Sequence, residues 1–116
     1  MAVPAVNAHD DRQADAVFKA LSDRSRRLLL DTLRERNGQT LTELCSDLAM
    51  ARQSVSKHLV VLEGASLVTT VRRGREKLHY LNPAPINEIA ERWISQYDQE
   101  RVRALSDLKR ALEDQA

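Results

Sequence analysis

The sequence predicts a mainly α fold with one small β-hairpin, in the element order α-α-α-α-β-β-α. Apolar residues recur at helical spacing between residues 10 and 65, and again from residue 86 almost to the end of the chain. Residues 67–72 and 76–81 are instead rich in β-branched or alternating residues, and a glycine lies between them. The length of 116 residues suits one domain with a modest core.

Two helices are expected before residue 37, after a flexible tail of residues 1–9 that has no hydrophobic period. The first begins near Asp10, and its apolar stripe consists of Ala14, Val17, Phe18 and Leu21. Asp23 is a natural N-cap for the second, over residues 24–36. Gly38 can take the left-handed conformation that closes it. Within this second helix Leu28, Leu29 and Leu33 are expected to face inward, with Leu30 at the side.

Residues 40–65 read as two short helices joined by a tight turn. Thr40 and Glu43 have the spacing of a capping box at the start of the first one. The turn falls at residues 49–51, where the side chains are compact. The buried faces are expected to consist of Leu41, Leu44, Cys45 and Leu48 in the first helix, and Val55, Leu59 and Leu62 in the second.

The opposite face of the second helix of this pair is polar and carries no acidic residue. Its outward residues are Gln53, Ser54, Ser56, Lys57 and His58. An α-helix fits the DNA major groove, where its side chains must offer donors and acceptors to base edges and cations to phosphates. This face therefore predicts DNA binding. The alternative is an ordinary polar helix face in contact with water.

The hairpin that follows has a basic tip, Arg73-Gly74-Arg75, in which glycine can adopt positive φ. A ribbon placed directly after a DNA-reading helix is a wing, whose cations can enter the minor groove or hold phosphates. The cations expected to do so are Arg72, Arg73, Arg75 and Lys77. The alternative is an exposed hairpin kept soluble by Arg and Lys.

Positive charge is concentrated in this part of the chain, although the net charge is only +1. Residues 1–51 carry 7 basic and 8 acidic side chains, residues 52–79 carry 6 and 2, and residues 80–116 carry 5 and 7. The segment net charges are therefore −1, +4 and −2. One cationic face is expected of a protein that meets DNA phosphates, although chance clustering gives the same pattern.

The sequence predicts one long final helix whose apolar residues run from Ile86 to Leu112. This helix lies in an expected dimerisation segment of residues 83–116, which follows an expected DNA-binding core of residues 10–82. At 1.5 Å per residue this helix is on the order of 40 Å long, too long for the small body before it to cover. A second chain is expected to cover its apolar stripe; the alternative is a return along the first helix of the same chain. The predicted interface consists of Val17, Phe18, Ile89, Trp93, Ile94, Tyr97, Leu105, Leu108 and Leu112.

Composition and motifs argue against a membrane protein, a secreted protein and an enzyme. No run of about 18 apolar residues predicts a membrane span, and residues 1–13 do not resemble a signal peptide, so a cytoplasmic location is expected. The single cysteine excludes an internal disulfide and a Cys-rich zinc site. The sequence contains no Ser-His-Asp set, no Gly-rich phosphate loop and no paired carboxylates at a strand end, so an enzyme is not expected. No cofactor is expected either.

The chain resembles the ArsR-type winged helix-turn-helix repressors over roughly residues 14–112. The matching stretches are 18–23 with Arg26-Arg27, Thr42-Glu43-Leu44, 52–59 with Leu62-Glu63, Leu67-Val68, Gly74-Arg75 and Tyr80-Leu81. The run Val55-Ser56-Lys57-His58-Leu59 is the most specific of them. The resemblance implies a homodimeric repressor that dimerises through its first and last helices and binds a roughly palindromic operator through the polar helix and the wing.

Two departures from the family pattern concern helix capping and metals. Ala51 stands where the family usually has a Ser or Thr cap. Cys45 is alone, and the last helix contains no His, so the chain is similar to the branch without a metal site. His9 with a C-terminal acid could bind zinc across a dimer only as a remote alternative. Two other functions stay open: a metal-, redox- or ligand-responsive sensor, for which the sequence names no effector, and a winged helix used only for protein contacts.

Overall fold

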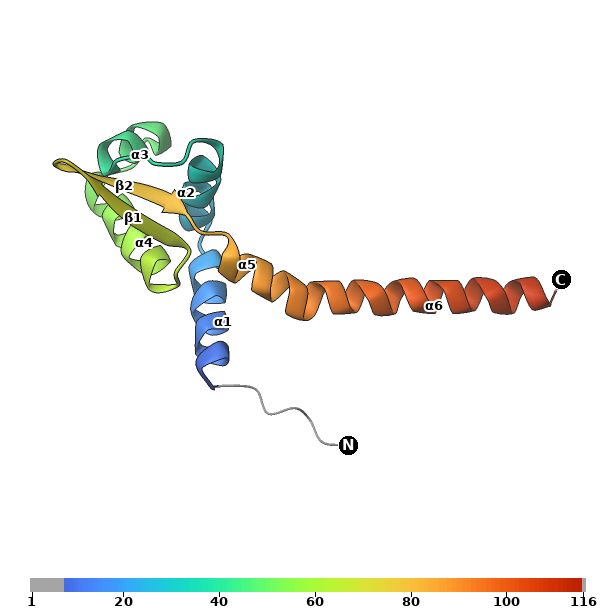
Figure 1. Ribbon diagram of the computed structural model, residues 1–116. Helices are drawn as coiled ribbons and strands as arrows, with labels where there is room; N and C mark the ends of the chain where they lie inside the picture. The colour runs from blue at the N-terminus through green and yellow to red at the C-terminus, as the bar shows by residue number, and fades with distance from the viewer. Residues whose placement is uncertain (1–7, 116) are drawn as a thin grey trace. The chain divides into compact units, whose positions relative to one another are not determined.

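The computed structural model describes residues 8–115, and for residues 8–10 and 94–99 it describes the backbone alone. The chain divides into two compact units between Pro85 and Ile86. The first contains helices α1 (Ala8–Leu21), α2 (Arg24–Glu35), α3 (Leu41–Leu48) and α4 (Arg52–Gly64), then strands β1 (Val68–Arg73) and β2 (Glu76–Leu81), as Figure 1 shows. The predicted fold class is confirmed. Of the predicted tail, residues 1–7 lie outside the described residues.

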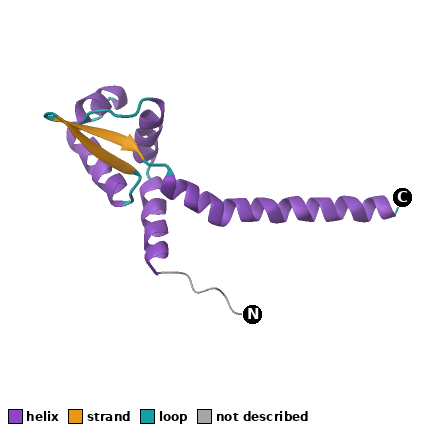
Figure 2. Ribbon diagram, viewed as in Figure 1, coloured by secondary structure: helices purple, strands orange, loops and turns teal. Residues whose placement is uncertain are grey.

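The C-terminal segment is helical but is not one regular helix. A short helix α5 (Ala84–Ile89) is followed by a π-helical turn η1 (Ala90–Ile94) and then by α6 (Ser95–Asp114), all drawn as helix in Figure 2. The expectation of a single helix from residue 86 is therefore wrong at this turn, where the guanidinium of Arg92 lies 4.4 Å from the centre of the Trp93 ring. Periodicity of apolar residues does not reveal one extra residue in a turn. No helix of the described residues is long and apolar enough to span a membrane.

The core of the first unit is aliphatic, as the low aromatic content predicts. Its largest fully buried side chains include Leu29, Leu33, Leu44 and Leu62. Leu28 was expected to face inward, but it is 44% exposed, and Leu30 is buried instead. Leu29 and Leu33 are buried as predicted, and α2 is in contact with α1, α3, α4 and β2.

Helix α3 begins with the predicted capping box. The Oγ1 of Thr40 accepts a hydrogen bond from the backbone N–H of Glu43 at 3.2 Å, and a Glu43 carboxylate oxygen accepts one from the backbone N–H of Thr40 at 3.2 Å. The Glu43 carboxylate accepts from both the backbone N–H and the hydroxyl of Thr40, and these two bonds lower the pKa of Glu43, because they favour the charged carboxylate. Asp23 likewise caps α2 as predicted, by accepting from the N–H of Arg26. Both caps fix where the helices begin.

The turn between α3 and α4 gives the unit its helix-turn-helix. Ala49 ends α3 in the left-handed conformation, with φ of 51°. Ala51 is the N-cap of α4 and makes no side-chain hydrogen bond to it. The start of α4 is instead tied to α3, because Arg52 Nη1 donates to Thr42 Oγ1 at 3.2 Å.

The two strands form an antiparallel hairpin with a register that pairs Arg73 with Glu76. The loop is therefore the two residues Gly74 and Arg75, and Arg73 belongs to the strand rather than to the predicted three-residue tip. An isolated bridge between Gln39 and His79 joins β2 to the segment before α3. The bridge therefore holds the middle of strand β2 against the segment that leads into the helix-turn-helix, in addition to the covalent link from α4 to β1.

Gly38 has positive φ, of +79°, but it does not cap α2 as predicted. Helix α2 ends at Glu35, and its C-cap Arg36 is extended. The left-handed glycine instead lets the chain pass beneath Tyr80, where a Cβ at residue 38 would lie 3.0 Å from the Tyr80 hydroxyl oxygen. The position therefore requires glycine for both its backbone and its space.

We expect Gly38→Ala to lower the free energy of unfolding by about 2 kcal/mol, through left-handed strain and crowding against Tyr80. Gly64→Ala is the matched control, because Gly64 lies within α4 and a Cβ added there would have no atom within 4 Å. That change should be neutral or stabilise the protein by up to about 1 kcal/mol. Urea unfolding of both variants measures the difference; equal effects would contradict this role of Gly38.

Candidate nucleic-acid interface

Helix α4 presents a polar face opposite its buried side. Val55, Leu59 and Leu62 are buried, whereas Gln53, Ser56 and Lys57 are exposed. Of the other two residues predicted for this face, Ser54 and His58 are half-buried and lie at its edge. The exposed part of α4 therefore carries amide, hydroxyl and ammonium groups and no carboxylate over its first two turns.

His58 is half-buried and lies near enough to the N-cap of α2 for its charge to act on Asp23. The pKa of Asp23 is lowered chiefly by the backbone N–H of Arg26, and the charges of Arg26 and His58 lower it further. His58 is therefore close to the α2 cap. Sequence periodicity alone did not separate it from the fully outward residues.

Two exposed side chains of α4, those of Arg52 and Val60, were absent from the predicted set. Arg52 and Val60 lie four residues before and after Ser56, on the same side of the helix, and both are exposed. This four-residue spacing was the signal that could have identified them. Arg52 adds a guanidinium to the first turn of α4.

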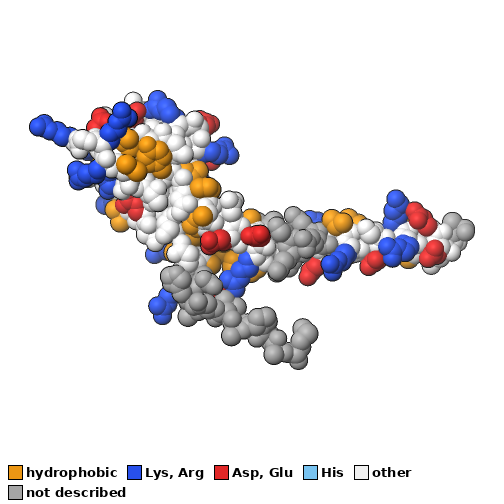
Figure 3. All heavy atoms as spheres, in the orientation of Figure 1, with side chains coloured by type: hydrophobic (Ala, Val, Ile, Leu, Met, Phe, Trp, Pro, Cys, Tyr) orange, Lys and Arg blue, Asp and Glu red, His pale blue; other side chains and the backbone are white. Residues whose placement is uncertain are grey.

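The wing carries its cations on its exposed outer part. Arg72, Arg73 and Arg75 are exposed, and no ion pair is formed by them within the described part of the chain. Lys77 differs, because its Nζ lies 3.7 Å from Oε1 of Glu63 on α4, which compensates part of its charge. Figure 3 shows Lys and Arg side chains gathered around the projecting end of the hairpin.

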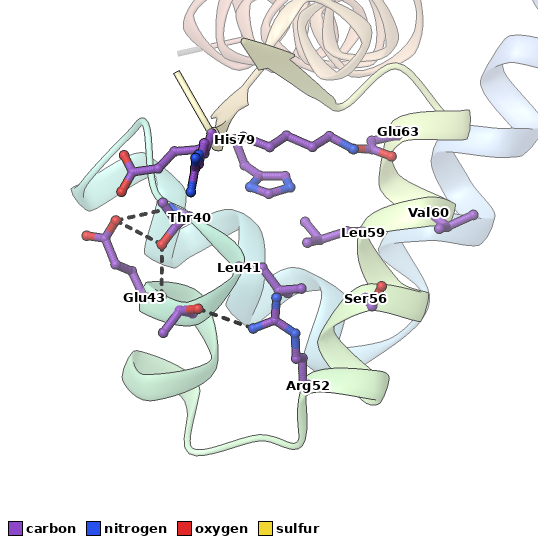
Figure 4. Close-up of a pocket in the computed structure, with 13 residues that line it drawn as sticks. Thr40, Leu41, Glu43, Arg52, Ser56, Leu59, Val60, Glu63 and His79 are labelled. Carbon is purple, nitrogen blue, oxygen red and sulfur yellow. Dashed lines mark hydrogen bonds and ion pairs between the residues drawn. The ribbon is translucent and has the colours of Figure 1, made fainter. Parts of the chain in front are cut away.

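A groove with a volume of about 700 Å³ lies between α3, α4 and the wing. Its lining includes Thr42 from α3, Arg52 and Ser56 from α4, and Lys77 and His79 from β2. Figure 4 shows that the Arg52 and His79 side chains enter it from opposite walls. The groove thus runs beside the exposed face of α4 and connects it to the wing.

No group of three or more His, Cys, Asp or Glu side chains is placed to hold a metal within the described part of the structure. Cys45 is a free, half-buried thiol. His79, expected simply to lie in the wing, is buried. His9 lies among the residues whose side chains are not described.

The residues predicted for the dimer interface differ in how much surface they offer. Val17 is fully buried in the core of its own unit, so it offers none, whereas Phe18 is 51% exposed. Ile89 and Trp93 are half-buried, and the side chains of Ile94 and Tyr97 are not described. Along α6, the exposed apolar residues are Val102, Leu105, Leu108 and Leu112. Val102 was missed in the sequence, although it lies three residues before Leu105.

A helix-turn-helix followed by a basic β-hairpin defines the winged-helix class of DNA-binding proteins. A family model described as a helix-turn-helix domain matches residues 21–71. The uncharacterised HTH-type transcriptional regulator YuzN of Bacillus subtilis is 46% identical over 86 residues, which cover 69% of this chain and 94% of that protein. The transcriptional repressor SdpR of the same species is 31% identical over 62% of this chain and 79% of its own length.

The fold is similar to solved structures of the same winged-helix class. An ArsR-like transcriptional regulator from Rhodococcus is 31% identical, covers 94% of this chain and 98% of its own, and superposes with a TM-score of 0.72. The homodimeric winged helix-turn-helix domain of Mb0332 from Mycobacterium bovis is 21% identical, covers 84% and 92%, and has a TM-score of 0.64, a likeness of fold. The chain belongs to the ArsR-like family of winged helix-turn-helix regulators. It is a DNA-binding transcriptional regulator.

Proposed function

We propose that this regulator is a sequence-specific repressor whose helix α4 enters the DNA major groove. The observation that carries the proposal is the exposed, acid-free face of α4, where Gln53, Ser56 and Lys57 offer groups suited to base edges and phosphates. Ser54 and His58 lie at the edge of this face and are assigned supporting contacts. In this account residues 10–82 form the DNA-binding core.

The wing is proposed to grip the DNA beside the major groove. Arg72, Arg73 and Arg75 are exposed at the end of the hairpin, where guanidinium groups can enter a narrow minor groove or hold phosphates. Lys77 is assigned a smaller contribution than the arginines, because Glu63 already compensates part of its charge.

The active form is proposed to be a homodimer on a roughly palindromic operator. Leu105, Leu108 and Leu112 leave an apolar stripe exposed along α6, within the segment 83–116, and Phe18 leaves another apolar surface on α1. Burial against a second copy would remove both from water. A protein of the same fold, Mb0332, is a homodimer, and the similar protein SdpR is a repressor, in keeping with this assignment. A cytoplasmic location goes with this proposal if the chain, like the similar proteins of Bacillus subtilis, acts on bacterial DNA.

The test is binding to an operator selected from a pool of random duplexes, followed by its salt dependence. Each phosphate that the protein neutralises contributes about −0.9 to the slope of log K against log salt, because condensed counterions are released. Three or four phosphate contacts from each of two subunits predict a slope of roughly −5 to −7. Failure to enrich any sequence, or a slope near zero, would contradict the proposal.

A further inference from the structure

The groove between α3, α4 and the wing has the volume of a small-molecule site. Its volume of about 700 Å³ lies within the usual range for such sites. Leu41, Leu59 and Val60 give it an apolar part, and polar side chains surround this part. Figure 4 shows Leu41 and Leu59 pointing into the groove from two different helices.

His79 places a hydrogen-bond acceptor in this groove. The residue is 4% exposed, and its Nδ1 lies 2.9 Å from the backbone oxygen of Gln39, which also accepts the His79 backbone N–H at 2.8 Å. A carbonyl oxygen only accepts, so Nδ1 carries the proton, and Nε2 of the neutral ring is left with a lone pair. The hydrogen bonds of the described residues give Nε2 no partner, and Figure 4 shows the ring pointing into the groove.

Arg52 places an available cation at the opposite wall. Within the described part of the chain its guanidinium makes one hydrogen bond, to Thr42, and no ion pair, although the group has five N–H donors. Two acids of the groove have cationic partners already. Arg36 lies 3.3 Å from Glu43, and Lys77 lies 3.7 Å from Glu63. The remaining charged residues of the lining, Arg75 and Glu76, are opposite in sign.

We propose that this groove binds a small hydroxylated carboxylate. The carboxylate pairs with the Arg52 guanidinium, the apolar body lies against Leu41 and Leu59, and the hydroxyl donates to Nε2 of His79. Ser56 and Lys77 line the groove and also belong to the predicted DNA interface. A bound ligand therefore opposes DNA binding; this consequence, unlike the site itself, rests on the proposed function.

The first experiment titrates the full-length protein, without DNA, with 4-hydroxybenzoate and follows the His79 ring signals by NMR. We expect saturable shifts of these signals. Benzoate, which lacks the hydroxyl, and 4-hydroxybenzamide, which lacks the charge, should each bind roughly tenfold more weakly. Arg52→Gln should weaken 4-hydroxybenzoate binding by a similar factor. Arg34→Gln, an exposed position of α2 outside the groove lining, is the control and should leave it unchanged.

If none of the three compounds gives a saturable change in the His79 signals, the proposed site is wrong. It is also wrong if Arg52→Gln and Arg34→Gln weaken 4-hydroxybenzoate binding equally. The second experiment titrates 4-hydroxybenzoate into the DNA complex, and we expect the ligand concentration that lowers DNA affinity to be roughly tenfold higher for Arg52→Gln than for the wild type. Unchanged wild-type affinity would overturn the regulatory consequence. If Arg52→Gln weakens DNA binding but the small molecules do not change the His79 signals, the groove contributes to DNA binding and is not a small-molecule site. Because the NMR titration contains no DNA, its failure is distinct from failure of the proposed function.

Discussion

Lys57→Glu is expected to weaken operator binding on the order of 100-fold or more while the protein stays folded and dimeric. Lys57 is exposed on the acid-free face of α4, so its replacement leaves the core of the unit unchanged. In a dimer the change removes two cations from the DNA interface and places two carboxylates there, which phosphates repel. Fluorescence anisotropy with the selected operator measures the affinity, and sedimentation equilibrium measures the dimer.

Arg34→Glu is the matched control for this experiment. It makes the same change of charge at an exposed position of α2, outside the predicted interface. We expect a loss of only a few-fold, through the long-range field. Equal losses for both variants would show that net charge, and not the α4 face, controls binding.

Leu105→Glu combined with Leu108→Glu is expected to raise the dimer dissociation constant by at least about 100-fold. Both leucines are more than half exposed on α6, and each buried leucine contributes about 1.5–3 kcal/mol to an interface. Operator affinity should fall when the dimer is lost, because two linked subunits bind two half-sites far more tightly than separate subunits do. Helix content should be retained, since glutamate is a good helix former.

The control places the same two charges on the other side of α6. Successive residues of a helix are rotated by about 100°, so Arg103 and Arg110 lie nearly opposite Leu105. Arg103→Glu with Arg110→Glu should therefore leave the dimer intact in sedimentation equilibrium. A dimer that survives the leucine changes, or is lost equally in both pairs, would contradict the assigned interface.

Local sequence signals predicted most of the fold. Asp23, Thr40 and Glu43 mark helix starts by hydrogen bonds within one turn, and such bonds depend on neighbouring residues alone. The hairpin followed equally from its residue types and from Gly74, which has the expected positive φ. These elements are local, so the sequence was sufficient for them.

The predictions differ from the structure where segments that are distant in the sequence pack together. Which of Leu28 and Leu30 is buried depends on the elements that surround α2, and the need for Gly38 depends on Tyr80, more than forty positions away. The Lys77–Glu63 ion pair and the contact of His79 with Gln39 also join separate elements. Periodicity gives the face of one helix, but it does not give the partners of that face.

Photo-crosslinking from position 53 tests the central claim most directly. A benzophenone side chain replaces Gln53 in the full-length protein, and Asp31, exposed on α2, receives the same group as a control. We predict crosslinks from position 53 to bases within each half-site of the operator, and none from position 31. Operator binding that persists without a base crosslink from position 53, or with one from position 31, would contradict the placement of α4 in the major groove.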